Sequence, residues 1–481
     1  MLDVKRNLTT MTDFYELTMS AGYLDEGYRD KISVFDMFFR RVPDGGGYAI
    51  MAGLEQFINA VDSLEFTQED IDYLRSTGAF NEAFLDYLKN FQLHCNIWAI
   101  EEGMPIFPQE PIVTVEGPAI ECQLLETLLL VTFNHQCLIA TKANRICRAA
   151  AGRPVMEFGA RRAQGYDAAY FGARASYIGG CGSTSCVMAA RDFGIPASGT
   201  MAHSWVQMFD SQYEAFKTYC QIYPTNATLL VDTYNVLKSG VPDAIRAFNE
   251  VLKPLGITKC GIRLDSGDIA YLSREARKML DDAGWTECQI SASNSLDEYI
   301  IRDLLQQGAK IDMFGVGERM ITASSQPVFG GVYKLAAVED AQGNIIPKIK
   351  VSENVDKITN PHFKKTYRIF DKATGKAEAD YIAVWDETVD ETQPLELFDP
   401  RATWKRKTYT NFEARPLQVQ VFKGGQLVYQ QPSLQEIQKY CAEQVDTLWD
   451  EVKRFENPHK YYVDLSQKLW DIKQELLRQR R

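Results

Sequence analysis

The sequence predicts an α/β fold built around a barrel of parallel strands, and three observations support this prediction. Short apolar segments suited to strands recur through the middle of the chain. Amphipathic helical patterns separate these segments, and polar, charged or glycine residues directly follow most of them. The carboxyl ends of parallel strands meet at one face of a barrel, so we expect the following residues to converge there.

Eight strands are predicted in this middle region, which is enough to close a barrel. They are centred near Val155, Tyr177, Thr200, Leu230, Ile262, Ile290, Met313 and Val332. The helices between them are predicted over residues 163–175, 185–193, 207–223, 241–255, 269–282 and 296–307.

The flanking segments predict additional layers, because 481 residues exceed one compact domain. We expect an N-terminal α+β domain over residues 1–145, a catalytic barrel over 146–338, and a region over 339–481 that packs on the N-terminal domain. The N-terminal domain has predicted helices over 13–23, 54–61 and 121–148 and predicted strands over 96–101 and 112–116. The C-terminal region has hairpin-like segments over 345–352 and 365–372, strands over 380–384 and 417–422, and helices over 436–456 and 463–480.

Composition and charge exclude several classes of protein. The formal net charge of −12 argues against a general binder of nucleic acid or anionic membranes. An anionic small substrate would need local positive charge, for which Arg161, Arg162 and Arg263 are the candidates. The ten cysteines are scattered and none of the five histidines lies beside a C-x-x-C pair, so we expect reduced thiols, no metal site made by protein ligands alone, and a cytoplasmic protein. No run of about eighteen apolar residues is present to predict a membrane span.

His203 is the first candidate for chemistry, because it lies at the polar end of a predicted strand in the sequence GTMAHS. An imidazole can act as an acid, a base or a phosphate-accepting nucleophile, and the hydroxyls of Thr200 and Ser204 are close in sequence. A lone histidine is more often a hydrogen-bonded structural residue. Its place at a strand end favours the catalytic interpretation.

Arg263 and Asp265 lie two residues apart, on the same side of a strand end, in the sequence RLDSGD. An arginine can bind a phosphate through two parallel hydrogen bonds, and an aspartate can hold ribose hydroxyls or magnesium. The alternative is an internal ion pair, with Asp268 capping the next helix, and for Asp268 we prefer this alternative.

Gly315 and Gly317 follow the seventh predicted strand, where barrels commonly bind phosphate. Glycines there let backbone amides approach an anion closely. Two glycines in a turn are equally often only a turn, so this signal is weak by itself.

Phe158 and Arg161 together suit a flat anionic ring, because one can stack on it and the other can bind a carboxylate. Thr184 and Ser185 follow the second predicted strand and add neutral hydroxyl donors. Tyr15 lies outside the barrel, and its sequence position alone predicts core packing.

Taken together, these residues resemble the nicotinate phosphoribosyltransferase family. The resemblance is carried by residues 12–19 (TDFYELTM), 157–162 (EFGARR), 199–204 (GTMAHS), 230–234 (LVDTY), 263–268 (RLDSGD) and 330–335 (GGVYKL). The motifs occur in the family's order from residue 12 to residue 335 and are specific as a set, although no single one is.

The resemblance implies an entry step of NAD salvage, the synthesis of nicotinate mononucleotide and pyrophosphate from nicotinate and phosphoribosyl pyrophosphate, with coupled ATP hydrolysis. It also implies a type II phosphoribosyltransferase barrel, which in this family is irregular with fewer than eight regular strands. A homodimer with shared active sites is implied as well, in which Tyr15 of the partner subunit stacks on the pyridine ring opposite Phe158.

The resemblance assigns roles to the candidate residues. His203 is implied to be the histidine phosphorylated by ATP. Thr200 and Arg263 are implied to line the ligand site, and residues 315–318, ending at Glu318, to hold the ribose-phosphate part. Asp232 and Asp265 are then candidates for stabilising the cationic ribosyl centre, and Asp265 also for the magnesium ion that enters with the substrate. In the related nicotinamide-using enzyme an aspartate takes the place of Ser185, where it would repel the nicotinate carboxylate.

Three other functions remain open from the residues. A quinolinate phosphoribosyltransferase would need a denser cluster of basic residues for its diacid substrate. A Schiff-base lyase would use Lys334, which lies within a predicted strand. A catalytically silent barrel that only binds a partner is disfavoured by His203, Arg263 and Asp265.

Overall fold

The computed structural model describes residues 7–479, and the chain divides into two compact units. The inserted unit spans Ile139–Pro327, and the split unit consists of the residues up to Leu138 and those from Val328 onward. The N-terminal and C-terminal segments therefore fold together into one unit. The long helix α6 (Glu126–Ala149) begins in the split unit and ends in the inserted unit.

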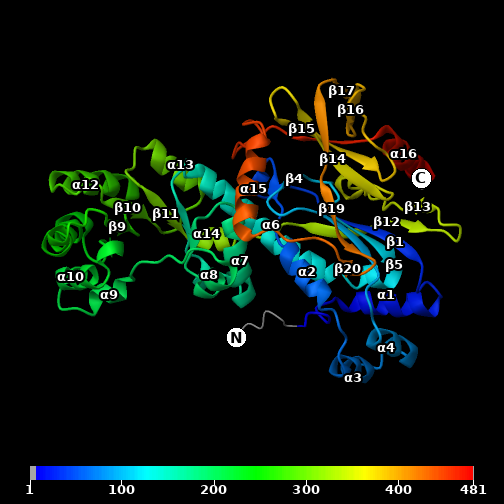
Figure 1. Cartoon of the computed structure of the whole chain (residues 1–481), viewed down its shortest axis with the longest axis horizontal. Coiled ribbons are helices and arrows are strands. Elements are labelled where there is room, and N and C mark those ends of the chain that lie inside the picture. Colours follow the sequence, from blue (N-terminus) through cyan, green and yellow to red (C-terminus); the bar gives the residue numbers. More distant parts are fainter. Residues whose placement is uncertain (1–6, 480–481) are drawn as a thin grey trace. The chain divides into compact units, whose positions relative to one another are not determined.

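A parallel sheet forms the centre of the inserted unit (Figure 1). In residues 139–327, all of which the structure describes, the sheet has six strands in the order β7-β6-β11-β10-β9-β8. The strands are β6 (Val155–Glu157), β7 (Ser183–Thr184), β8 (Thr228–Leu230), β9 (Gly261–Leu264), β10 (Gln289–Ala292) and β11 (Met313–Val316). Because the first strand, β6, pairs with the last, β11, the strand order is that of a barrel in which the pairing between β7 and β8 is missing. The α/β fold is confirmed, whereas the sheet is not a closed barrel in the described residues.

Three of the eight predicted barrel strands are wrong. Tyr177 lies in helix α7, and the buried run around it has no polar face from which periodicity could distinguish a helix from a strand. The segment of Thr200 pairs with β7 only through one isolated bridge between Thr184 and Ala197. Val332 does lie in a strand, β12, but that strand belongs to an antiparallel sheet of the split unit.

Helices connect the parallel strands and cover the sheet (Figure 1). They are α7 (Tyr166–Ile178), α8 (Val187–Phe193), α9 (His203–Gln207), α10 (Gln212–Ile222), α11 (Val241–Ala247), α12 (Ile269–Asp282), α13 (Glu298–Gln306) and α14 (Glu318–Ile321). The helix predicted over 207–223 is divided, because the Ser211 side chain accepts a hydrogen bond from Glu214 N and starts α10 as a new helix. The helix predicted over 241–255 continues beyond α11 as the turns Phe248–Leu252 and Lys253–Leu255, the last of which contains a proline.

An antiparallel sheet forms the centre of the split unit. Within the described parts of this unit it has seven strands in the order β13-β12-β1-β5-β3-β19-β20. They are β1 (Ile32–Phe39), β3 (Asn96–Ile100), β5 (Val113–Pro118), β12 (Gly331–Glu339), β13 (Ile345–Pro347), β19 (Gln418–Lys423) and β20 (Gln426–Leu427). Strand β1 is central and almost entirely buried, with Phe35 facing Leu335 of β12 on one side and Val115 of β5 on the other.

The C-terminal region of the split unit adds smaller sheets. The strands are β14 (Lys364–Asp371), β15 (Ala377–Val384), β16 (Leu395–Asp399), β17 (Ala402–Tyr409), β18 (Phe412–Pro416) and β21 (Tyr462–Leu465), and the short pair β2 (Ala49–Ile50) and β4 (Pro105–Ile106) lies in the N-terminal segment. Arg368 and Asp380 face each other across β14 and β15 and form a fully buried two-bond ion pair, with Nε–Oδ1 at 2.8 Å and Nη2–Oδ2 at 2.7 Å.

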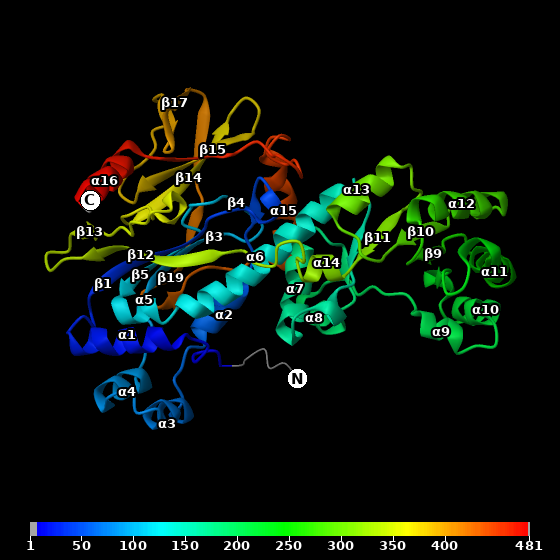
Figure 2. The ribbon, with the colours of Figure 1, turned by 180° about the vertical axis from the view of Figure 1, so that it is seen from behind.

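The helices of the split unit flank these sheets, and Figure 2 shows α3 and α4 side by side. The helices are α1 (Phe14–Asp25), α2 (Leu54–Asp62), α3 (Gln68–Ser76), α4 (Glu82–Lys89), α5 (Ala119–Gln123), α15 (Leu434–Thr447) and α16 (Gln467–Gln479). The helix predicted over 436–456 is wrong in its second half, because α15 ends at Thr447. The helix predicted over 463–480 is wrong at its start, because residues 463–465 belong to strand β21, and its last residue lies outside the described residues.

One helical stretch of the described chain, Ala119–Ala149, is long and apolar enough to cross a membrane, which the sequence analysis did not expect. Its most apolar part has a mean hydropathy of 1.3, and 67% of that part is buried inside the protein. Burial of this extent is typical of a core helix.

Candidate active site

His203 and Asp232 form a hydrogen-bonded pair at the carboxyl end of the parallel sheet. His203 is the first residue of α9, and Asp232 follows β8 by two residues. The imidazole Nε2 lies 3.2 Å from Asp232 Oδ1. The Asp232 side chain is 1% exposed and the His203 side chain is 42% exposed. The buried carboxylate therefore holds one edge of the imidazole ring, while the rest of the ring is accessible to a ligand.

The Asp232 carboxylate is fixed by the loop that follows β9. Its Oδ2 accepts hydrogen bonds from the backbone N–H of Asp265 at 3.0 Å and from the Ser266 hydroxyl at 2.6 Å. A carboxylate only accepts, so this contact favours the tautomer in which Nε2 donates and, in the neutral ring, Nδ1 carries no proton. The histidine therefore presents Nδ1 as its nucleophilic or basic atom.

Arg263 is held in place at the end of β9 by three neighbouring segments. Its Nε donates to Ser293 Oγ at 2.8 Å, its Nη1 to Thr200 Oγ1 at 2.9 Å, and its Nη2 to Asp265 Oδ1 at 3.0 Å. The Ser293 hydroxyl also donates to Asp265 Oδ1. The internal ion pair considered from the sequence is present, and the predicted convergence of Thr200, Arg263, Asp265, Asp232 and His203 is observed in one hydrogen-bonded network.

Asp268 has the structural role that the sequence analysis preferred. Its side chain accepts a hydrogen bond from Tyr271 N and caps α12. Ser293, in contrast, was missed by the sequence analysis, although it follows β10 in the same way that Asp232 follows β8.

The glycines at the end of β11 are required by the close approach of Phe158. A Cβ at Gly315 would lie 2.6 Å from Phe158 Cδ2, and one at Gly317 would lie 2.9 Å from the Phe158 carbonyl oxygen. The Arg263 guanidinium carbon lies 5.8 Å from the centroid of the Phe158 ring. Packing against Phe158 thus accounts for both glycines, and phosphate binding at this turn stays a prediction.

Arg161 and Ser185 lie on the loops that follow two adjacent strands, since Glu157 of β6 pairs with Thr184 of β7. Arg161 and Ser185 are both exposed, and Arg162 forms a 3.9 Å ion pair with Glu318. Thr184 is fully buried, and its hydroxyl donates to Glu157 Oε2 at 2.6 Å. The Thr184 hydroxyl therefore donates its hydrogen bond to Glu157 and is not the donor for a ligand that the sequence had suggested.

Glu157 is a second residue that the sequence analysis missed. Its side chain is completely buried, and burial raises the pKa of the carboxyl, while the hydrogen bonds from Thr184 and from the backbone of Gly159 act in the opposite direction. The available signal was the acidic residue at the end of an apolar strand in the motif EFGARR.

Tyr15 lies on α1 of the split unit and is not a core residue. Its side chain is 44% exposed, and the neighbouring Phe14 and Met19 are 53% and 38% exposed. Partial burial, followed by the nearby Glu126 carboxylate, raises the pKa of the Tyr15 hydroxyl.

No group of three or more histidine, cysteine, aspartate or glutamate residues in residues 7–479 is arranged to hold a metal ion. Lys334 lies on β12 of the split unit, and its ammonium pairs with Glu126 at 3.4 Å, so it is not one of the residues at the end of the parallel strands. All ten cysteines lie in the described residues, and none of them forms a disulfide.

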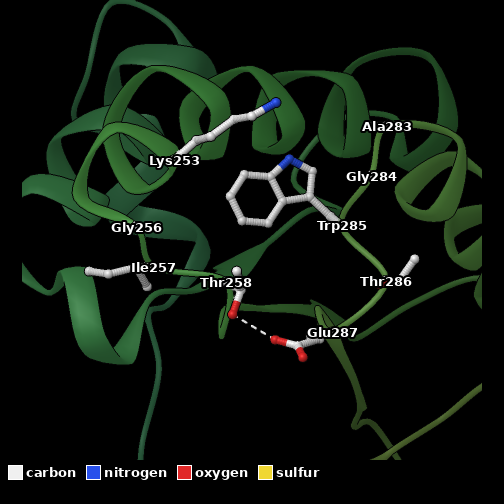
Figure 3. A pocket seen from close by; sticks show the side chains of 9 residues that line it. All are labelled: Lys253, Gly256, Ile257, Thr258, Ala283, Gly284, Trp285, Thr286 and Glu287. Atoms are coloured by element: carbon white, nitrogen blue, oxygen red, sulfur yellow. Dashed lines mark hydrogen bonds between the residues drawn. The ribbon is translucent and has the colours of Figure 1, made fainter.

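A cavity of about 380 Å³ lies at the opposite, amino end of β9 and β10 (Figure 3). Lys253, Trp285 and the hydrogen-bonded pair of Thr258 and Glu287, 2.6 Å apart, surround it. The segments that line it precede the strands. Ligands of parallel α/β sheets bind at the carboxyl ends, so this cavity is separate from the candidate active site.

Similar solved structures define the class of the fold. Human nicotinic acid phosphoribosyltransferase matches with a TM-score of 0.85 and 28% identity, covering 97% of this chain and 99% of that one. Nicotinate-nucleotide pyrophosphorylase from Pyrococcus furiosus has the same fold, with a TM-score of 0.70 over 92% of this chain at 24% identity. With the polar network at the strand ends, these matches define a phosphoribosyltransferase of the type II barrel group.

Sequence comparisons define the family within this class. Models of the nicotinate phosphoribosyltransferase N-terminal domain, family region and C-terminal domain match residues 10–134, 154–345 and 363–473. The nicotinate phosphoribosyltransferase of Bacillus subtilis is 44% identical over 98% of this chain and 95% of its own length. The human enzyme is 31% identical, with 95% of each chain covered. The chain belongs to the nicotinate phosphoribosyltransferase family. This membership favours that family over the two alternatives left open by the sequence, a quinolinate phosphoribosyltransferase and a Schiff-base lyase.

Proposed function

We propose that this protein transfers the phosphoribosyl group of phosphoribosyl pyrophosphate to the ring nitrogen of nicotinate, giving nicotinate mononucleotide and pyrophosphate. The observation that carries the proposal is the network of His203, Asp232 and Arg263 at the strand ends of a family member. The transition state has a cationic ribosyl centre, so the site needs positioning and charge stabilisation more than covalent chemistry.

His203 is proposed to accept the γ-phosphoryl group of ATP on Nδ1, with release of ADP. Asp232 holds the proton on Nε2 and stabilises the positive charge that the ring gains as the new bond forms. The exposure of the ring leaves room for a nucleotide to approach.

Nicotinate is proposed to bind beside Phe158, with Arg161 and the Ser185 hydroxyl facing its carboxylate. Tyr15 of the partner subunit is proposed to close the pocket by stacking on the pyridine ring, in a homodimer with shared sites. The exposed aromatic and thioether groups on α1 support this part of the proposal, because they suit an interface.

Phosphoribosyl pyrophosphate is proposed to lie along Arg263, Thr200 and the turn from Gly315 to Glu318. Magnesium fits the site as an ion carried by the pyrophosphate oxygens, since Asp265 offers a carboxylate at the edge of the network. When bound, it would supply positive charge to the departing pyrophosphate. The free thiols are compatible with the cytoplasmic location that we also propose.

The test is incubation of the purified protein with nicotinate, phosphoribosyl pyrophosphate and magnesium, with and without ATP, followed by detection of the nucleotide product. We expect turnover of nicotinate, stimulation by ATP, and an acid-labile phosphate label on the protein from γ-labelled ATP. In His203→Ala the label and the stimulation should both disappear. Failure of the wild-type protein to form nicotinate mononucleotide would contradict the proposed function, and retention of the label in His203→Ala would contradict the role of His203.

A further inference from the structure

Glu157 is a buried carboxyl whose two oxygens both bind segments of the proposed nicotinate pocket. Oε2 accepts the Thr184 hydroxyl at 2.6 Å, and Oε1 accepts the backbone N–H of Gly159. Both donors are neutral groups of the inserted unit. Burying a carboxyl group is costly, and these two hydrogen bonds offset that cost.

The contact with Gly159 fixes the turn that carries Phe158 and Arg161. A Cβ at Gly159 would lie 2.5 Å from Ile321 Cβ and 2.9 Å from Glu157 Oε1, so the turn is packed tightly between the carboxyl and α14. The next bond along the turn, from Arg162 N to the Gly159 carbonyl, is 2.7 Å long. The direction in which the Phe158 ring and the Arg161 side chain leave this turn therefore depends on Glu157.

The contact with Thr184 fixes the loop that carries Ser185. Thr184 Oγ1 donates to Glu157 and accepts from Cys186 N at 3.0 Å, while the Glu157 carbonyl accepts from Ser185 N at 2.9 Å. Glu157 thus connects the loop of Phe158 and Arg161 with the loop of Ser185. These are the two loops that we propose to bind the ring and the carboxylate of nicotinate.

We propose that Glu157 is a positioning residue for nicotinate, which sets the distance between the loop of Phe158 and Arg161 and the loop of Ser185 without touching the substrate. This inference rests on the proposed function and adds to it the residue that determines the shape of the acid-binding pocket. Both loops that Glu157 connects are proposed to contact nicotinate directly, whereas the residues proposed for phosphoribosyl pyrophosphate touch them only through Phe158. We therefore expect the loss of Glu157 to affect nicotinate more than phosphoribosyl pyrophosphate.

The test compares Glu157→Ala, Glu157→Gln and Thr184→Val in steady-state assays that vary each substrate separately. In Glu157→Ala, which removes both side-chain hydrogen bonds, we expect the KM for nicotinate to rise about tenfold or more, with kcat and the KM for phosphoribosyl pyrophosphate within about threefold of wild type. Glutamine keeps an acceptor for Gly159 N and a polar contact with Thr184, so Glu157→Gln should restore the KM for nicotinate to within about threefold of wild type.

Thr184→Val removes the hydroxyl at nearly constant volume and should raise the KM for nicotinate in the same way. The KM for nicotinate in the double variant Glu157→Ala/Thr184→Val should not exceed that of the worse single variant, because both substitutions remove the same hydrogen bond between Glu157 and Thr184. Glu110→Ala is the matched control: Glu110 is a fully buried carboxyl of the split unit that accepts Phe107 N at 3.0 Å. It should lower the melting temperature without changing the KM for nicotinate.

The outcomes separate the two proposals. Wild-type protein that does not turn over nicotinate would overturn the proposed function and this inference with it. Wild-type turnover combined with an unchanged KM for nicotinate in Thr184→Val and Glu157→Ala, or with equal increases in the KM for both substrates, would overturn the inference alone. If Glu157→Ala does not fold, Thr184→Val and Glu157→Gln decide the question by the same criteria.

Discussion

At the scale of single residues, the orientation and tautomer of the His203 ring are set by one buried carboxylate, Asp232. Asp232 accepts from His203 Nε2, from Asp265 N and from the Ser266 hydroxyl, so it has no freedom to rotate. A neutral amide at this position would change which ring nitrogen carries the proton.

Asp232→Asn should therefore impair phosphorylation of His203 more than it impairs folding. The asparagine amide can donate to Nε2, which moves the proton to Nδ1 and removes the acceptor for the phosphoryl group. We expect the rate of labelling from γ-labelled ATP to fall by about 100-fold or more. Asp268→Asn is the control, because asparagine is an equally good helix N-cap and the labelling rate should not change. Labelling of Asp232→Asn at the wild-type rate would show that the tautomer does not matter.

Ser185 should determine the choice between an acidic and an amide substrate. A carboxylate at this exposed position, in Ser185→Asp, would repel nicotinate but not nicotinamide. We expect the ratio of kcat/KM for nicotinate to that for nicotinamide to fall at least about tenfold. Ser185→Asn has nearly the same shape without the charge and should leave the ratio closer to wild type. An unchanged ratio in Ser185→Asp would exclude Ser185 from the pocket.

At the scale of secondary structure elements, β11 and the loop after β6 pack closely at Gly315, which has no side chain. The Phe158 ring occupies the space where a Gly315 side chain would lie. Gly315→Ala should therefore displace the ring, raise the KM for nicotinate, and lower the free energy of unfolding by about 1–3 kcal/mol. At Gly182, just before β7, the nearest atom to a Cβ is 4.0 Å away, so Gly182→Ala should have little effect in the same assays. Equal behaviour of the two variants would contradict the packing role of Gly315.

Strand β21 carries a carboxyl that makes the stability of the split unit depend on pH. Burial, together with the nearby Asp399, raises the pKa of Asp464 to about 7. An acid whose pKa is raised by folding stabilises the fold when it is protonated. Its contribution is therefore complete below the ordinary aspartate pKa and is lost as the pH rises through 7.

Asp464→Asn should remove this dependence. We expect the variant to be more stable than wild type at pH 8, by roughly 1–3 kcal/mol, and to approach wild type near pH 4. Chemical denaturation at both pH values measures the difference, with the exposed Asp471→Asn as the control. A variant that is less stable than wild type at pH 8 would contradict the assignment.

Strand β9 and helix α12 show how much of the fold the sequence could predict. The short strand segment 261–264 is followed by a run of polar residues. Helix α12 spans Ile269–Asp282 as predicted, because Asp268 caps it and its buried residues recur at helical spacing. Local patterns of this kind contain the needed information. The pairing of β12 does not follow from local patterns, since its partner β1 lies about 300 residues earlier in the chain.

The candidate site was predictable to the same extent. Asp232 and Asp265 follow apolar strands and Arg263 lies near the end of one, so a common sheet edge brings these three together. His203 joins them at the start of α9, although the strand predicted before it is absent. Glu157 was missed because it looks like one more charged residue at a strand end, and its importance comes from burial, which a single sequence does not show. The hydroxyl of Thr184 was misread for the same reason.

At the scale of the whole molecule, the proposed homodimer predicts complementation between two inactive variants. If Tyr15 of the partner subunit completes each site, a mixed dimer of Tyr15→Ala and His203→Ala contains one site with both wild-type residues. Unfolding and refolding the two variants together should restore about one quarter of the wild-type activity by random pairing. Tyr15→Ala mixed with Tyr15→Ala/His203→Ala is the control and should restore none. Absence of activity in the first mixture would contradict shared sites.

The insertion of one unit into the other determines the order in which the chain can fold during synthesis. Strand β1 is made early but pairs with β12, and about 300 residues separate Phe35 from its partner Leu335. At 5–20 residues per second, β1 waits roughly 15–60 s on the ribosome for this partner. The parallel sheet is complete by Val316, so the inserted unit can fold while the edge of β1 is still unpaired. The nascent N-terminal segment therefore exposes apolar strand residues such as Phe35 and Met37 during that interval, and chaperones that bind such segments should engage the chain there rather than at the catalytic unit.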